Sequence, residues 1–131
     1  MRWAALVAWL LTAGGGSILL LTWLRHGGPS RREGIGLVRL VTHAGTALMG
    51  LACWIGFIAT EGSWLAWVAV ALLAVVSAIG LSMFVRWLRG RNEAQHTELP
   101  AEAAFPVPIV IVHGGLALLT VTLSILAAVG V

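Results

Sequence analysis

The stretch L-V-T-H-A-G-T-A-L-M-G, residues 40–50, places a histidine between small and aliphatic side chains inside an apolar run that extends from 36 to 59. Such a run is long enough for a helix that crosses the hydrocarbon core of a bilayer, which takes roughly 20 residues. An ionisable side chain inside such a helix is costly, so its presence indicates a function. The stretch therefore predicts a membrane helix that carries a functional imidazole, His43.

Three further apolar runs, 3–24, 64–88 and 107–130, surround this one in a chain of 131 residues. The composition is 60% hydrophobic and only 10% charged, and the mean hydropathy is +0.98, which a water-soluble domain of this length does not reach. Backbone groups in lipid must be hydrogen-bonded internally, so each run predicts a helix. We expect an all-α, up-down bundle of four transmembrane helices that forms a single membrane domain over 1–131.

The positive charge follows the topology of this bundle. All eight basic residues are arginines, and seven of them lie in or beside the segments 25–34 and 86–100. By the positive-inside rule both segments are cytoplasmic, so both termini lie outside and the protein is expected in the cell membrane as a multi-pass protein. The net charge of +3 then reflects orientation in the membrane, and nucleic acid is not expected as a partner.

The chain also contains an internal repeat. The segment G-S-I-L-L-L-T-W-L-R (16–25) resembles G-L-S-M-F-V-R-W-L-R (80–89), and H-A-G-T-A-L (43–48) resembles H-G-G-L-A-L (113–118). Two matches in the same order indicate two parallel helical hairpins, 1–60 and 61–131, related by a pseudo-two-fold axis along the membrane normal.

The two repeated histidines are predicted to lie at one depth. His43 and His113 follow the expected starts of their helices by about seven and six residues, or roughly 10 and 9 Å at the rise of an α-helix. Gly16 and Gly80 lie seven residues before Trp23 and Trp87. These two tryptophans are expected to anchor their helices at the cytoplasmic boundary of the membrane, where the histidine helices also begin. In an up-down bundle the histidine helices face each other diagonally, as do the glycine helices. This arrangement predicts a planar cofactor that is held by two imidazoles between glycine walls.

Haem is the expected cofactor, because imidazole is a good axial ligand for haem iron. Arg39, one turn before His43, and Arg86 are candidate partners of the haem propionates, although Arg39 could equally extend to the lipid headgroups. A chlorophyll-type pigment remains an alternative. A bare metal fits poorly, since no carboxylate or thiolate stands near the histidines in the sequence. Structural histidines that only hydrogen-bond a neighbouring helix remain a further alternative.

The pattern resembles the haem-binding four-helix bundle of the cytochrome b family. The resemblance implies that His43 and His113 match one of that family's histidine pairs, and that Gly16 and Gly80 match the glycines facing it. The family carries a second histidine farther along each ligand helix, where this chain has Gly56-Phe57 and Ala127-Ala128. The expectation is therefore a single haem b near the cytoplasmic side.

The expected function is electron transfer by a small b-type cytochrome-like subunit, within a larger respiratory or redox complex. Its expected partners are other membrane subunits or further copies of the chain, with quinone as a candidate redox partner. No Ser/His/Asp set, acidic pair or phosphate-binding loop points to catalysis by the chain alone. The alternatives are a cofactor-free structural or assembly subunit and a pigment-binding membrane protein.

Overall fold

A computed structural model describes residues 1–31, 34–93 and 99–130 of the chain. Over these residues the protein is all-helical and has no β-strand, as the sequence predicts. Four α-helices make up most of it: α1 (Arg2–Arg25), α2 (Leu37–Thr60), α3 (Ser63–Glu93) and α4 (Val107–Ala128). Two short 3-10 helices, η1 (Gly28–Ser30) and η2 (Ala101–Ala104), lie in the connections.

All four long helices have the length and hydropathy that a membrane crossing requires. Large apolar side chains cover their outer faces; Val38 of α2 is 80% exposed and Leu118 of α4 is 70% exposed. Apolar surface of this extent suits lipid rather than water. The fold is therefore compatible with a multi-pass membrane protein.

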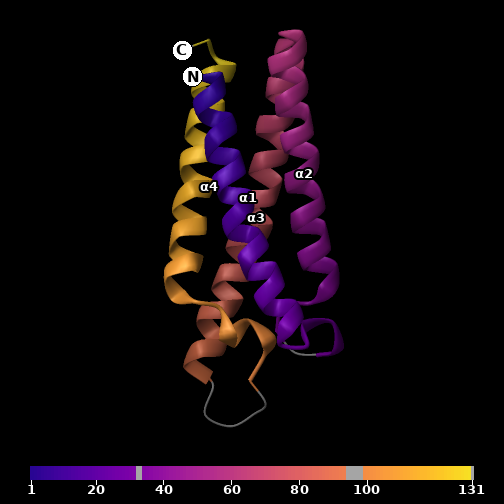
Figure 1. Ribbon diagram of the computed structural model, residues 1–131, viewed down its shortest axis with the longest axis vertical. Coiled ribbons are helices and arrows are strands. Elements are labelled where there is room, and N and C mark those ends of the chain that lie inside the picture. Colours follow the sequence, from indigo (N-terminus) through magenta and orange to yellow (C-terminus); the bar gives the residue numbers. More distant parts are fainter. Residues whose placement is uncertain (32–33, 94–98, 131) are drawn as a thin grey trace.

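The helices run alternately up and down (Figure 1). Both termini lie at one end, together with the short link between α2 and α3, and the two longer connections lie at the other end. Helix α2 packs mainly against α3, and α1 packs mainly against α4. Because α1–α3 and α2–α4 are the weakly contacting pairs, they form the two diagonals, as the up-down prediction requires.

At the end that carries the termini, two tryptophans fill the interior. Trp54 of α2 is fully buried and its Nε1 donates a hydrogen bond to the carbonyl oxygen of Arg2 at 3.2 Å. Trp9 of α1 lies over Gly50, where a Cβ atom would stand only 2.7 Å from its ring. The positions of Trp3, Trp9, Trp64 and Trp67 in the sequence predict a belt of tryptophans at the outer lipid interface. Trp3, Trp64 and Trp67 are exposed, whereas Trp9 is 4% exposed, so this prediction is wrong for Trp9.

At the opposite end, a second core lies beneath the connections. Trp23 and Trp87, expected as anchors at the lipid interface, are 1% and 4% exposed, and this expectation is also wrong. They pack in one cluster with Phe105 and Ala101, which follow α3 in the chain, and with Ile35, which precedes α2. The connections fold back over the helix ends and bury side chains that would otherwise be exposed there.

A buried carboxylate joins these two connections. Glu102 of η2 is 2% exposed, and its Oε1 accepts a hydrogen bond from the backbone N–H of Ile35 at 2.6 Å. Gly34, in the left-handed region at φ +90°, lies directly against the Glu102 carboxylate. The guanidinium of Arg31 adds a bond to the carbonyl of Leu99 at 2.6 Å. The two connections are thus packed onto each other.

Candidate functional site

The imidazole rings of His43 and His113 meet inside the bundle. Their centroids are 6.4 Å apart, and the ring planes are inclined by 65°. Each ring is half-buried, and the two come from the diagonal helices α2 and α4. The structure therefore brings together the two histidines that the sequence pairs by motif and depth.

Each histidine is held by a backbone carbonyl of a neighbouring helix. Nδ1 of His43 lies 3.1 Å from the carbonyl oxygen of Val76, and Nδ1 of His113 lies 2.9 Å from that of Thr12. A carbonyl oxygen can only accept, so each Nδ1 carries the proton and donates it. In a neutral imidazole, Nε2 then keeps its lone pair. Metal-bound histidines commonly have such a bond on the other ring nitrogen, because it fixes the tautomer and the ring orientation.

The predicted glycines lie directly against these rings. A Cβ atom at Gly80 would stand 3.0 Å from Cε1 of His43, and one at Gly16 would stand 3.1 Å from Cε1 of His113. These distances are tighter than most Cβ contacts, so glycine allows each imidazole to approach the opposing backbone. The neighbouring Gly14 has open space around it, and Gly15 is at ordinary contact distance from His113. In the three-glycine run, the close approach thus belongs to Gly16 alone.

The same contacts occur in both halves of the chain. His43 of α2 bonds to the carbonyl one turn before Gly80 on α3, and His113 of α4 bonds to the carbonyl one turn before Gly16 on α1. An internal repeat with two-fold pseudo-symmetry would produce this equivalence. The hairpin boundaries 1–60 and 61–131 stay a prediction.

The two halves differ two helical turns beyond the histidines. Thr120, seven residues after His113, is fully buried, and its Oγ1 lies 3.0 Å from Oγ1 of Thr12. The equivalent position after His43 is Gly50, which receives the ring of Trp9. A hydroxyl pair therefore joins α1 to α4, while an aromatic side chain fills the corresponding space beside α2.

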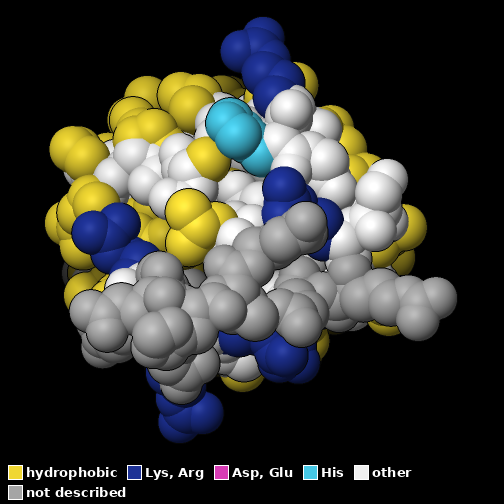
Figure 2. Space-filling model, turned by 90° about the horizontal axis from the view of Figure 1, so that it is seen from below, with side chains coloured by type: hydrophobic (Ala, Val, Ile, Leu, Met, Phe, Trp, Pro, Cys, Tyr) yellow, Lys and Arg dark blue, Asp and Glu magenta, His cyan; other side chains and the backbone are white. Residues whose placement is uncertain are grey.

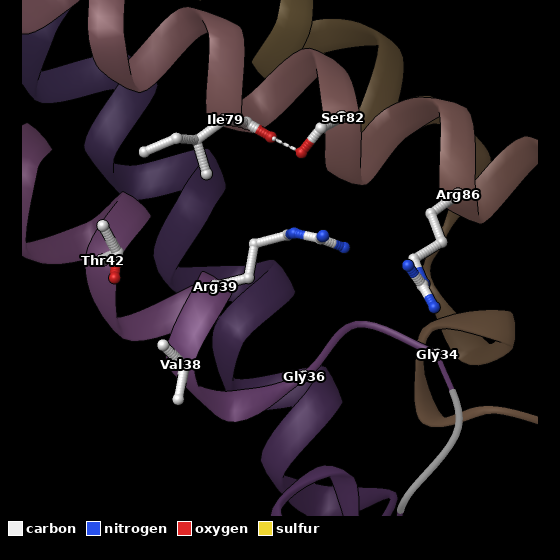
Figure 3. A pocket seen from close by; sticks show the side chains of 8 residues that line it. All are labelled: Gly34, Gly36, Val38, Arg39, Thr42, Ile79, Ser82 and Arg86. Carbon is white, nitrogen blue, oxygen red and sulfur yellow. Dashed lines mark hydrogen bonds between the residues drawn. The ribbon is translucent and has the colours of Figure 1, made fainter.

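Arg39 and Arg86 lie in a separate groove. Their side chains point into one open space at the loop end of α2 and α3 (Figure 3). The groove has a volume of about 520 Å³ and is also lined by Gly34, Gly36, Val38, Thr42, Ile79 and Ser82. On α3, the lining residues Ile79, Ser82 and Arg86 follow an i, i+3, i+7 spacing, so they form a stripe that runs beside Val76 and Gly80. Both arginines line this groove and neither histidine does, and the role of the arginines toward propionates stays a prediction.

A bare-metal site finds no support in the arrangement of side chains. Within residues 1–31, 34–93 and 99–130, no group of three or more His, Cys, Asp and Glu side chains gathers where a metal ion could bind. A haem iron has a lower demand on the protein, because the macrocycle supplies the equatorial ligands and two imidazoles complete the shell. Two imidazoles alone are fewer ligands than a protein usually gives to an isolated metal ion.

Sequence reasoning missed the carbonyl oxygens of Val76 and Thr12, because a backbone acceptor has no side-chain signature. The one available signal was position, since each acceptor precedes a predicted site glycine by four residues. No family model matches the chain, and no curated protein or solved structure is significantly similar to it. The functional argument therefore depends on the site itself.

Proposed function

We propose that the protein is a small b-type cytochrome-like membrane subunit in which His43 and His113 hold one haem as its axial ligands. The observation that carries the proposal is the matched pair of Nδ1–carbonyl bonds on two rings whose centroids are 6.4 Å apart. Two metal–imidazole bonds of about 2 Å each, together with the ring radii, separate the centroids of axial ligands by about 6 Å. The observed separation of the two ring centroids, 6.4 Å, is close to this value and supports the proposal.

The haem would supply reversible one-electron chemistry, as in other proteins with histidine-ligated iron. The chain's own contribution is to orient the two imidazoles through the carbonyl groups of Val76 and Thr12, and to let each ring lie close against the neighbouring helix at Gly80 and Gly16. Electrons would pass to and from other membrane subunits or a quinone, with substrate chemistry located in a partner. The resemblance to the cytochrome b family supports this reading without naming the partners.

Packing at the other end of the bundle supports a single haem. Trp9 and Trp54 fill the interior there together with Ala5, Ala69 and Leu73. The protein interior is close-packed, so a second macrocycle would have to displace these side chains. We therefore propose one haem, at the level of His43, nearer to the arginine-bearing connections than to the termini.

The proposed orientation places those connections in the cytoplasm and both termini outside. Arginine side chains project around the face at the loop end (Figure 2). Positive charge beside membrane helices is retained on the cytoplasmic side during insertion. The haem would then lie in the inner half of the membrane.

One observation favours a different function. Both Nδ1 atoms are already hydrogen-bonded across helices, and the two rings contact each other edge to face. Histidines that only form hydrogen bonds between helices would show the same features. In that case the chain is a cofactor-free structural or assembly subunit. A pigment-binding protein would use the same histidine pair and is distinguished by its absorption spectrum.

A reduced-minus-oxidised visible spectrum of the purified protein tests the proposal. We expect the bands of a low-spin b-type haem, lost in both His43→Ala and His113→Ala. The matched control is His26→Ala, because His26 is exposed directly after α1 and its Nδ1 lies 2.8 Å from the carbonyl oxygen of Thr22, four residues earlier. Colourless wild-type protein from haem-supplied cells would establish the structural alternative. Pigment bands in place of haem bands would show that the bound cofactor is a pigment and not haem.

A further inference from the structure

The groove at the loop end of α2 and α3 concentrates positive charge. Arg39 and Arg86 reach into it from opposite walls (Figure 3). Over the described residues, the ion pair joins Arg2 to Glu61, and the buried Glu102 is engaged by Ile35, so neither groove arginine is paired with a described carboxylate. Two guanidinium groups that share one open space attract an anion.

Apolar side chains make the same groove accessible from lipid. Val38, 80% exposed, and Ile79 line it beside the arginines. Arg39 is the third residue of α2, so the charged part of the groove lies near the helix end, where lipid headgroups begin. A ligand that fits this distribution is amphiphilic, with an anionic head between the arginines and an apolar tail along the helices.

We propose that this groove binds the phosphate headgroup of an anionic phospholipid from the leaflet on the loop side. Guanidinium groups bind phosphate oxygens in bidentate geometry, and basic pockets between membrane helices are a recognised form of lipid site. The Thr42 and Ser82 hydroxyls on the two walls provide further polar contacts. The site is distinct from the histidine pair, because neither His43 nor His113 is among the residues that line the groove.

Lipid titration of the purified, delipidated protein tests the proposal by native mass spectrometry. We expect phosphatidylglycerol to bind more tightly than phosphatidylcholine, and the double variant Arg39→Gln/Arg86→Gln to weaken phosphatidylglycerol binding by about tenfold or more, or roughly 1.4 kcal/mol. The matched control is Arg89→Gln, an exposed arginine of α3 outside the groove, which should change the affinity less than about twofold. The helical signal in circular dichroism verifies that each variant is folded.

Several outcomes would overturn the proposal. Equal binding of both lipids, or unchanged phosphatidylglycerol binding in the double variant, would show that the groove is not a site for anionic lipid. Complete displacement of the lipid by millimolar inorganic phosphate would make the groove a free-phosphate site. If the double variant loses haem but still binds phosphatidylglycerol, the two arginines bind the haem propionates and not a lipid. Absence of haem from the wild type would not affect the lipid measurement, so the two proposals fail separately.

Discussion

Gly80 of α3 lies so close to His43 of α2 that a methyl group at position 80 would stand 3.0 Å from the imidazole Cε1. The same ring is held at Nδ1 by the carbonyl oxygen of Val76, one turn away on α3. The imidazole is thus fixed against one stretch of helix by a hydrogen bond and by the absence of a side chain. Gly16 and Thr12 hold His113 in the same way.

Replacement of either glycine by alanine should separate cofactor binding from helix stability. In Gly16→Ala and Gly80→Ala the added methyl group displaces the imidazole by a few tenths of an ångström, so we expect the haem-to-protein ratio to fall. Alanine favours the helix over glycine by up to about 1 kcal/mol, so the apoprotein should unfold at an equal or slightly higher denaturant concentration. Haem content by pyridine haemochrome assay and unfolding by circular dichroism measure the two effects.

Gly14→Ala is the matched control on α1, because nothing lies within 4 Å of a Cβ atom at that position. It should retain the wild-type haem content. Full haem content in both Gly16→Ala and Gly80→Ala would show that these glycines do not shape the cofactor site.

The four-helix fold could be predicted from the sequence because of the length and hydropathy of its apolar runs. Four apolar runs of sufficient length leave little choice of secondary structure, and the fixed rise of the helix makes the matched depth of His43 and His113 readable by counting. The burial of Trp9, Trp23 and Trp87 was not predictable in this way. An aromatic residue near a helix end suits the lipid interface and a covered core equally well, and the path of the connections decides between them.

The arginines show the same limit. The spacing of Arg39 and His43 places them near one helical face, but Arg39 lines a groove together with Arg86, and His43 is not among the residues that line it. A difference of a few tens of degrees around a helix axis separates the two locations. Sequence spacing fixes the level of a side chain better than its direction.

Thr120 should stabilise the α1–α4 pair. Thr120→Val removes the buried hydroxyl that lies 3.0 Å from that of Thr12, and leaves the shape of the side chain nearly unchanged. Interhelical hydrogen bonds in membrane proteins contribute about 0.6 kcal/mol on average and up to about 1.7 kcal/mol. We expect a loss of unfolding free energy in this range, measured by titration with a denaturing detergent.

Thr122→Val is the control for this change, since the Thr122 hydroxyl is exposed and bonds only to Leu118 of its own helix. It should be nearly neutral. An equal loss in both variants would mean that the Thr12–Thr120 contact does not stabilise the helix pair.

The buried Glu102 should be essential to the packing of the connections. Glu102→Gln keeps an oxygen that accepts the Ile35 N–H, whereas Glu102→Ala leaves that buried N–H without its partner, at a cost of about 1–3 kcal/mol. Limited proteolysis of the loop end and the thermal unfolding midpoint should therefore distinguish alanine from glutamine. Similar behaviour of the two variants would show that the hydrogen bond does not hold the connections together.

Gly34 and Gly27 provide a paired test of the same contact. Both have positive φ, +90° and +76°, but only Gly34 lies against the Glu102 carboxylate, while Gly27 has open space. Gly27→Ala should cost only the backbone strain, about 1 kcal/mol. Gly34→Ala adds a steric clash and should lower the unfolding midpoint further. Equal midpoints in the two variants would contradict the proposed contact.

The orientation in the membrane can be tested with single cysteines in a Cys53→Ala background. Ser63 is exposed at the end that carries the termini, and Ser30 is exposed at the arginine-bearing end. Because positive segments stay in the cytoplasm, a membrane-impermeant maleimide should label Ser63→Cys in intact cells and Ser30→Cys only after permeabilisation. Labelling of both positions after permeabilisation serves as the accessibility control. The reverse pattern in intact cells would show that the protein has the opposite orientation, with the histidine pair in the outer half of the membrane.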